Sequence, residues 1–200
     1  MFSLYGFKPH FQSLLRPQVA RLAARGVSPN SVTLTCFGLC AGYGALLAVT
    51  GSPLAFAFLP VVLLLRMAGN AIDGMLAREH GRASLLGARL NELTDVASDI
   101  CLYLPFVRLV QPAGLVVTAV LAGMLAELAG VLAGAHGGVR DYRGPFGKSD
   151  RAAFFGLMAL LLPALEPAGS VVTALFVLAA AGGLLTTWNR LTQGVRSCQS

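Results

Sequence analysis

Residues 70–95 read NAIDGMLAREHGRASLLGARLNELTD, and they place acids, amides and arginines between two apolar runs. The run before them, LAFAFLPVVLLLRMAG, covers residues 54–69, and the run after them, VASDICLYLPFV, covers residues 96–107. The polar stretch continues into an apolar run at each of its ends. The pattern therefore predicts two helices, each with one apolar and one polar half, joined by a short polar turn. The turn makes these helices antiparallel neighbours and brings their polar ends together.

The whole chain is too apolar for a soluble protein. Of its 200 residues, 56% are hydrophobic and only 12% are charged. One soluble core cannot bury that much apolar surface, so the surplus must face lipid. A span needs roughly 20 mostly apolar residues, so six spans with short loops would use most of this length. The net charge of +6 then reflects membrane topology, and no nucleic-acid partner is expected.

Six apolar segments, separated by polar or proline-containing breaks, are the expected spans. They lie at residues 32–50, 54–78, 84–110, 114–134, 152–165 and 168–188. Asn30 or Ser31 is expected to cap the first of these helices. Before them, residues 10–25 carry apolar and basic side chains at helical spacing, which predicts an amphipathic helix in the headgroup layer. We therefore expect an all-α integral membrane protein of six transmembrane helices preceded by an amphipathic interfacial helix. Its expected parts are an interfacial segment at 1–30, a six-helix domain at 31–190 and a C-terminal tail at 191–200.

The basic residues predict the orientation of the spans. Of the 15 lysines and arginines, all but Arg66 and Arg108 fall on one side of the membrane if there are six spans. Basic residues accumulate on the cytoplasmic side, so both termini are expected in the cytoplasm. No secretory signal precedes the first span, which favours a multi-pass protein of a bacterial inner membrane.

Polar residues form two stripes at the cytoplasmic ends of the second and third spans. Asn70 and Asp73 are three residues apart, while Asn91, Asp95 and Asp99 follow one another at intervals of four. Each set therefore lies along one face of its helix. Carboxylate and amide oxygens are ligands for magnesium, and a bound cation relieves repulsion between carboxylates in a low dielectric. The stripes predict a divalent-metal site.

The same residues also have structural interpretations. Asp73 or Asp95 could form a buried ion pair with Arg66, and Asp99 could equally be the partner of an arginine. The asparagines could instead form hydrogen bonds between helices. Acids inside membrane spans are usually functional, which favours the metal site for the aspartates.

Small and basic residues flank the two stripes. Gly74, Ala77 and Gly87 add little bulk, so a nucleotide or another helix could approach the backbone closely. Positive charge suited to phosphate lies at the same membrane face, on Arg78, Arg82 and Arg89.

The run from Asn70 to Asp95 resembles the signature of the membrane-embedded class I CDP-alcohol phosphatidyltransferase family, D-x2-D-G-x2-A-R-x8-G-x3-D-x3-D, with every gap matched. Two weaker similarities support it. Residues 28–33, SPNSVT, look like the family's P-N-x-x-T motif before the first span, and residues 147–151, GKSDR, precede the fifth. Together these similarities cover nearly the whole chain.

The resemblance implies a six-helix enzyme, usually a homodimer, that binds a CDP-activated lipid and a divalent metal, Mg²⁺ or Mn²⁺, at the cytoplasmic face. It would move a phosphatidyl or phospho-alcohol group, from CDP-diacylglycerol for example, to an acceptor alcohol and release CMP in phospholipid synthesis. By position, the resemblance assigns metal ligands (Asp73, Asp95, Asn70 and Asn91), CDP-binding residues (Gly74, Ala77, Arg78 and Gly87) and a catalytic base (Asp95). It also makes Lys148 and Arg151 candidates for the phosphate of the second substrate.

The chain departs from this signature at Asn70 and Asn91, where the family has aspartate. An amide oxygen still ligates magnesium but compensates less of its charge. Asp99, one helical turn beyond Asp95, could restore one charge and is the second catalytic candidate. The site then holds one metal, a rearranged pair or none. A catalytically silent nucleotide- or lipid-binding relative is the alternative to an active transferase, and a small transporter is less favoured because the polar groups gather near one face.

Overall fold

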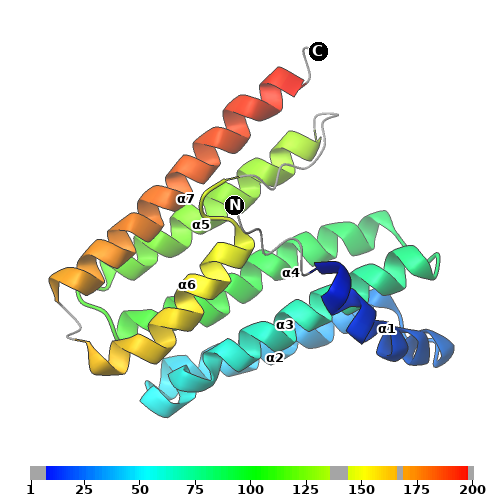
Figure 1. Ribbon diagram of the computed structural model, residues 1–200, viewed down its shortest axis with the longest axis horizontal. Helices are drawn as coiled ribbons and strands as arrows, with labels where there is room; N and C mark the ends of the chain where they lie inside the picture. The colour runs from blue at the N-terminus through cyan, green and yellow to red at the C-terminus, as the bar shows by residue number, and fades with distance from the viewer. Residues whose placement is uncertain (1–7, 136–143, 166–168, 198–200) are drawn as a thin grey trace. The chain divides into compact units, whose positions relative to one another are not determined.

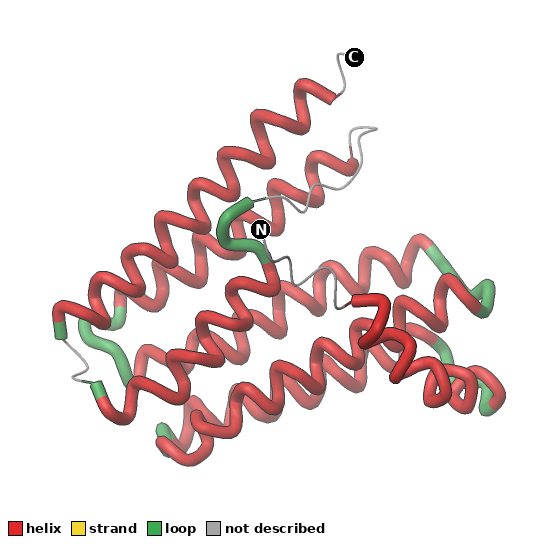
Figure 2. The backbone as a smooth tube through the Cα atoms, in the orientation of Figure 1, coloured by secondary structure: helices red, strands yellow, loops and turns green. Residues whose placement is uncertain are grey.

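The computed structural model describes residues 8–135, 144–165 and 169–197, and every regular element within these ranges is helical (Figures 1 and 2). The α-helices are α1 (Lys8–Ala24), α2 (Pro29–Thr50), α3 (Pro53–Glu79), α4 (Leu85–Tyr103), α5 (Gly114–Ala135), α6 (Lys148–Leu161) and α7 (Ser170–Ser197). Two short 3₁₀ helices, η2 (Leu104–Arg108) and η3 (Leu162–Ala164), continue α4 and α6. The all-α prediction is confirmed for this part of the chain. Parts of the predicted N-terminal segment, of the stretch between the fourth and fifth predicted spans and of the predicted tail lie outside the described residues, at 1–7, 136–143 and 198–200.

Four of the expected spans are long and apolar enough to cross a membrane: Pro29–Thr50, Pro53–Glu79, Gly114–Gly134 and Ser170–Thr192. The third expected span corresponds to α4 and η2, where the α-helix gives way to a 3₁₀ helix that has a proline in its first turn. The fifth corresponds to α6, which has only 14 residues. Helix α4 has a larger fraction of charged residues than those four helices, and α6 is shorter than they are. Six spans therefore remain a prediction.

The start of α2 differs from the sequence-based expectation. A cap at Asn30 or Ser31 was expected, but the helix begins at Pro29, and the Ser31 amide donates a hydrogen bond to Ser28 Oγ at 3.1 Å. Serine is a favoured N-cap and proline a favoured first helical residue, so the pair Ser28-Pro29 outcompetes the later candidates. The expected start of the third span near Ser84 is confirmed, because Gly87 N donates to Ser84 Oγ at 3.0 Å.

The described chain divides into two compact units, residues 1–42 with 61–98 and residues 43–60 with 99–200. In the first unit, Val19 of α1 is fully buried against Met75 and Leu76 of α3. Arg16 of α1 also forms an exposed ion pair with Glu79 at 3.0 Å. One side of the amphipathic helix is thus occupied by protein, and its place in the headgroup layer stays a prediction.

The second unit has an aromatic core. Tyr103 stacks on Phe155 with ring centroids 4.1 Å apart, and Phe106 meets Phe155 edge to face at 5.2 Å. Helices α5 and α7 lie side by side (Figure 1), and Gly183 allows the close approach, because a β-carbon there would lie 2.9 Å from Ala122 Cβ. This packing holds the helices that carry the second set of buried charges.

Candidate active site

The predicted polar stripes of α3 and α4 meet within the first unit. Asn70 Nδ2 of α3 donates a hydrogen bond to Asp95 Oδ1 of α4 at 2.7 Å. Arg66, one turn earlier on α3, donates from Nη2 to the backbone oxygen of Asp95 at 2.7 Å, and the same nitrogen lies 3.5 Å from Asp95 Oδ1. The Arg66 side chain is 4% exposed, so its charge is shielded from water. Arg66 and Asn70 therefore fix Asp95 from two successive turns of α3.

The second signature aspartate is fixed from a different helix. Thr33 Oγ1 of α2 donates a hydrogen bond to Asp73 Oδ2 at 2.8 Å, and both residues are buried. Thr33 is the threonine of the SPNSVT motif, and its place on α2 follows from the helix start at Pro29. A motif that is weak in sequence thus has a direct contact with the site.

Asn91 contributes an oxygen with unused hydrogen-bonding capacity. Its Oδ1 is inaccessible to solvent and has no hydrogen-bond partner within the described part of the chain. A buried acceptor without a donor is costly unless a ligand satisfies it. We name Thr33, Arg66, Asn70, Asp73, Asn91 and Asp95 the α3–α4 cluster.

The oxygens of this cluster fit a divalent cation, because two carboxylates and an orphaned amide oxygen are hard ligands of the kind magnesium takes. No group of three His, Cys, Asp or Glu side chains suited to a metal occurs among the described residues. A cation held by this cluster would use amide oxygens and water as well as carboxylates.

The predicted nucleotide-binding residues lie beside the cluster in sequence and contact one another in part. A β-carbon added to Gly74 would lie 2.9 Å from Arg78 Nη2, so the glycine gives the exposed guanidinium room to fold back over α3. At Gly87 a β-carbon would lie 2.6 Å from Asn30 Oδ1 of α2. Both glycines therefore permit close approaches within the protein, and Ala77 is half-buried on the same helix as Gly74.

Arg82 has a structural role that the sequence did not reveal. Its Nη1 donates to the backbone oxygen of Val27 at 2.7 Å, and its Nη2 donates to that of Ala23 at 3.2 Å. Ala23 lies in the last turn of α1, where carbonyl oxygens lack partners within the helix, and Val27 follows the helix. Arg82 thus ties the α1–α2 turn to the α3–α4 turn.

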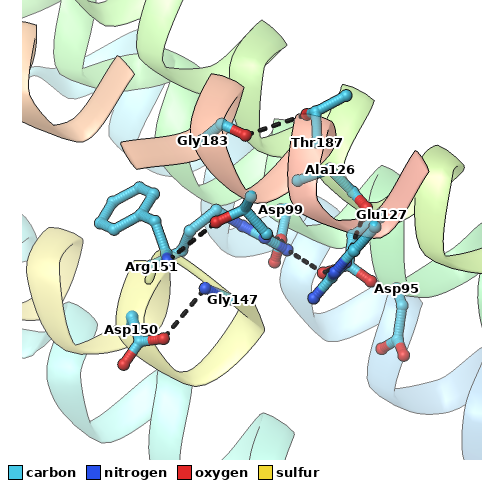
Figure 3. Close-up of polar contacts among 12 residues, drawn as sticks. Asp95, Asp99, Ala126, Glu127, Gly147, Asp150, Arg151, Gly183 and Thr187 are labelled. Carbon is cyan, nitrogen blue, oxygen red and sulfur yellow. Dashed lines mark hydrogen bonds and ion pairs between the residues drawn. The ribbon is translucent and has the colours of Figure 1, made fainter. Parts of the chain in front are cut away.

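A second set of buried charges lies in the second unit (Figure 3). Arg151 of α6 donates to Asp99 Oδ2 of α4 from Nη2 at 2.8 Å and from Nε at 3.2 Å, and to Glu127 Oε1 of α5 from Nη2 at 3.0 Å. Arg190 Nη1 of α7 lies 3.6 Å from the same Glu127 oxygen and donates to the backbone oxygen of Ala126 at 2.6 Å. We name Asp99, Glu127, Arg151 and Arg190 the ion-pair cluster.

The GKSDR motif builds the start of α6 and delivers Arg151. Gly147 N donates to Asp150 Oδ2 at 2.9 Å, which caps the first turn (Figure 3). Gly123 of α5 makes room for the arginine, since a β-carbon there would lie 2.6 Å from Arg151 Cδ. Lys148, the first residue of α6, is half-buried.

Sequence reasoning missed Glu127 and Arg190. Glu127 lies inside α5 and Arg190 inside α7. A carboxylate in the middle of the predicted span 114–134 is a sequence signal for a functional group or a buried ion pair. The predicted residues Asp99 and Arg151 are brought together with each other, in agreement with the interpretation of Asp99 as the partner of an arginine.

This chain is similar to a known protein family and to several known proteins. The model of a family described as CDP-alcohol phosphatidyltransferase matches residues 27–188. Inner membrane protein YnbA of Escherichia coli K12 is 50% identical over 159 residues, which are 79% of this chain and 79% of that protein. The phosphatidylinositol phosphate synthase of Corynebacterium glutamicum is 34% identical over 103 residues, which are 52% of this chain and 45% of that protein.

The fold resembles that of a solved structure. The phosphatidylinositol phosphate synthase PgsA1 of Mycobacterium tuberculosis, solved with CDP-DAG bound, superposes with a TM-score of 0.72 over 89% of this chain and 92% of that chain. The two sequences are 20% identical, so the likeness concerns the fold alone. Together with four helices long and apolar enough to span a bilayer, the inner-membrane relative identifies an integral membrane protein.

Proposed function

The chain belongs to the CDP-alcohol phosphatidyltransferase family, and from that premise we propose that it transfers a phosphatidyl group from CDP-diacylglycerol to an acceptor alcohol in phospholipid synthesis. The alcohol oxygen forms a bond to the phosphorus that carries diacylglycerol, the bond from that phosphorus to CMP breaks, and CMP leaves. The single observation that carries this proposal is the α3–α4 cluster, in which Asp95 is fixed by Arg66 and Asn70 at the position of the signature's last acid.

We propose Asp95 as the general base. It accepts the proton of the acceptor hydroxyl as the new P–O bond forms, which raises the nucleophilicity of the alcohol. The contacts from Arg66 and Asn70 hold the carboxylate in one orientation, so no reorganisation is needed at the moment of proton transfer. Asp73, held by Thr33, and Asn91 would ligate a divalent metal. Asn70 and Asp95, the other two ligands that the signature predicts, contact each other through a hydrogen bond. When bound, that Mg²⁺ or Mn²⁺ ion neutralises charge on the pyrophosphate.

Among the remaining predicted residues, Arg78 and Lys148 are the proposed contacts to the substrate phosphates. Arg78 is exposed beside Gly74 and supplies positive charge for the CDP phosphates. Lys148 is the better candidate for a phosphate on the second substrate, because the Arg151 side chain is 3% exposed and bound to two carboxylates. We propose for Asp99 the role of arginine partner, with the catalytic role as the competing hypothesis.

Membrane topology and assembly complete the proposal. We propose a multi-pass protein of a bacterial inner membrane with both termini in the cytoplasm, supported by the asymmetry of basic residues and by the YnbA relative. A homodimer is the expected assembly. Labelling of engineered cysteines from outside intact cells tests the topology: a cysteine at Pro53 should react and one at Lys148 should not.

The decisive experiment offers purified protein CDP-diacylglycerol with a panel of alcohols and follows CMP release and lipid products by mass. We expect metal-dependent CMP release with one alcohol or one class of alcohols. The two asparagines in the signature favour a second candidate, a silent nucleotide- or lipid-binding relative. That protein would bind CDP-diacylglycerol without releasing CMP, whatever the alcohol or metal.

A further inference from the structure

Asp95 is surrounded by hydrogen-bond donors on the side where it faces α3. Its Oδ1 accepts from Asn70 Nδ2 at 2.7 Å and lies 3.5 Å from Arg66 Nη2. Both donors come from the same stripe of α3, four residues apart. A cation bridging positions 70 and 95 would have to displace the Asn70 hydrogen bond and lie close to the positive charge of Arg66.

The amide at position 70 makes this arrangement possible. If residue 70 were a carboxylate, two carboxylates would lie in contact, and they would need a cation or a shared proton between them. The amide of Asn70 removes that need, since its NH₂ group donates directly to Asp95. Arg66 then supplies the positive charge from within the chain, and its burial keeps the attraction to Asp95 strong.

Asp73 and Asn91 are the two predicted metal ligands that take no part in the contacts of Arg66 and Asn70 with Asp95. Asp73 is buried, one of its oxygens accepts from Thr33, and Asn91 Oδ1 is buried without a hydrogen-bond partner among the described residues. One carboxylate and neutral oxygens compensate only part of the charge of a divalent ion, so binding should be weak compared with a site of several carboxylates.

We propose that this site holds a single divalent cation and that Arg66 and Asn70 take the place of a second one at Asp95. Arg66 is then a positioning residue that substitutes for a metal. The inference rests on the proposed function for its location, but its test measures bound metal and does not depend on turnover.

The experiment counts Mn²⁺ bound to the purified full chain by electron paramagnetic resonance and follows thermal unfolding with EDTA and with added Mg²⁺. Wild type should bind one ion per chain. The double variant Arg66→Met/Asn70→Asp should bind two, should unfold at a lower temperature in EDTA, and should recover with Mg²⁺. The single variant Asn70→Asp keeps Arg66, so it should bind its second ion at least about tenfold more weakly than the double variant does.

A matched control adds the same charge elsewhere. Asn189→Asp places a new carboxylate on α7, outside the α3–α4 cluster, and should leave the count at one. Two ions in wild type would overturn the inference, as would none, or a double variant that still binds one ion and is insensitive to Mg²⁺. The metal count and the proposed function fail independently. Two bound ions in wild type together with CMP release would contradict only this inference. One bound ion without CMP release, whichever alcohol is offered, would contradict only the proposed function.

Discussion

The two buried charge clusters of this protein are built in opposite ways. In the ion-pair cluster, two arginines meet two carboxylates, and the guanidinium of Arg151 bridges Asp99 and Glu127 within 3.0 Å through Nη2. In the α3–α4 cluster, amide and hydroxyl groups do much of the contacting: Asn70 bonds Asp95, and Thr33 bonds Asp73. The first cluster is balanced in formal charge, whereas the second sets two aspartates against a single arginine.

This difference suggests a structural role for the ion-pair cluster and a chemical role for the α3–α4 cluster. Matched buried ion pairs fix helices and have little affinity left for a ligand, and removing one partner leaves a costly uncompensated charge. A cluster with two carboxylates, one arginine and an unsatisfied buried oxygen at Asn91 is the better candidate for a ligand-binding site. We therefore expect substitutions in the ion-pair cluster to reduce stability and substitutions in the α3–α4 cluster to reduce activity.

The largest expected effect is on turnover in Asp95→Asn. Loss of the general base should lower kcat by about 10²–10⁴-fold while the protein remains folded, because an asparagine side chain keeps nearly the shape of aspartate. CMP release at saturating CDP-diacylglycerol measures the loss of kcat, and thermal unfolding in detergent shows whether the variant remains folded. Glu79→Gln, which alters only an exposed ion pair, is the control. Near-normal turnover in Asp95→Asn would move the base elsewhere.

The next effect is on stability in Glu127→Gln. Glu127 is 8% exposed and faces both arginines, so its loss leaves two buried positive charges with one carboxylate. We expect about 3–5 kcal/mol of destabilisation. Chemical denaturation in detergent measures the destabilisation. The protein that remains folded should keep its Mg²⁺ midpoint, which is the Mg²⁺ concentration that gives half-maximal CMP release. A stable variant with altered metal dependence would contradict the division between the two clusters.

How far the sequence predicts these clusters depends on the kind of signal. The spacing from Asn70 to Asp95 was enough to place two polar stripes on facing helices, and the hydrogen bond between those residues confirms that they meet. Capping rules were less reliable at Asn30, because a serine two residues earlier competes for the same helix start.

The sequence did not predict which charged residues, far apart along the chain, form ion pairs with one another. Glu127 and Arg190 are separated by a whole helix and two loops, and no local periodicity links them. Arg151 looked like a free phosphate ligand in the GKSDR motif, whereas tertiary packing at Gly123 directs it to Asp99 and Glu127. Partner choice among charges depends on packing that spacing does not encode.

A smaller effect is expected in Thr33→Val, which removes the hydroxyl donor to Asp73 and keeps the side-chain shape. Groups that orient a metal ligand typically change metal affinity by about tenfold or more when removed, so the Mg²⁺ midpoint of CMP release should rise by about that factor. Thr118→Val is the matched control, because the hydroxyl of Thr118 bonds only the Gly114 carbonyl of its own helix. An unmoved midpoint in Thr33→Val would leave Asp73 outside the metal site.

The smallest expected effect separates the two predicted roles of Asp99. If Asp99 compensates for the acid missing at Asn91, then Asp99→Asn should raise the Mg²⁺ midpoint, and adding Asn91→Asp should partly restore it. The contact with Arg151 leads to the opposite expectation: Asp99→Asn should lower stability, by less than Glu127→Gln because Glu127 remains on Arg151, and should leave the midpoint unchanged. Titrating CMP release against magnesium in both single variants and the double variant gives the interaction energy between positions 91 and 99. Additive effects of the two substitutions would assign Asp99 to the ion-pair cluster, because a residue that shares no ligand with Asn91 has no route to couple with it. A rescued Mg²⁺ midpoint would instead extend the metal site along α4 and end the contrast between the two clusters.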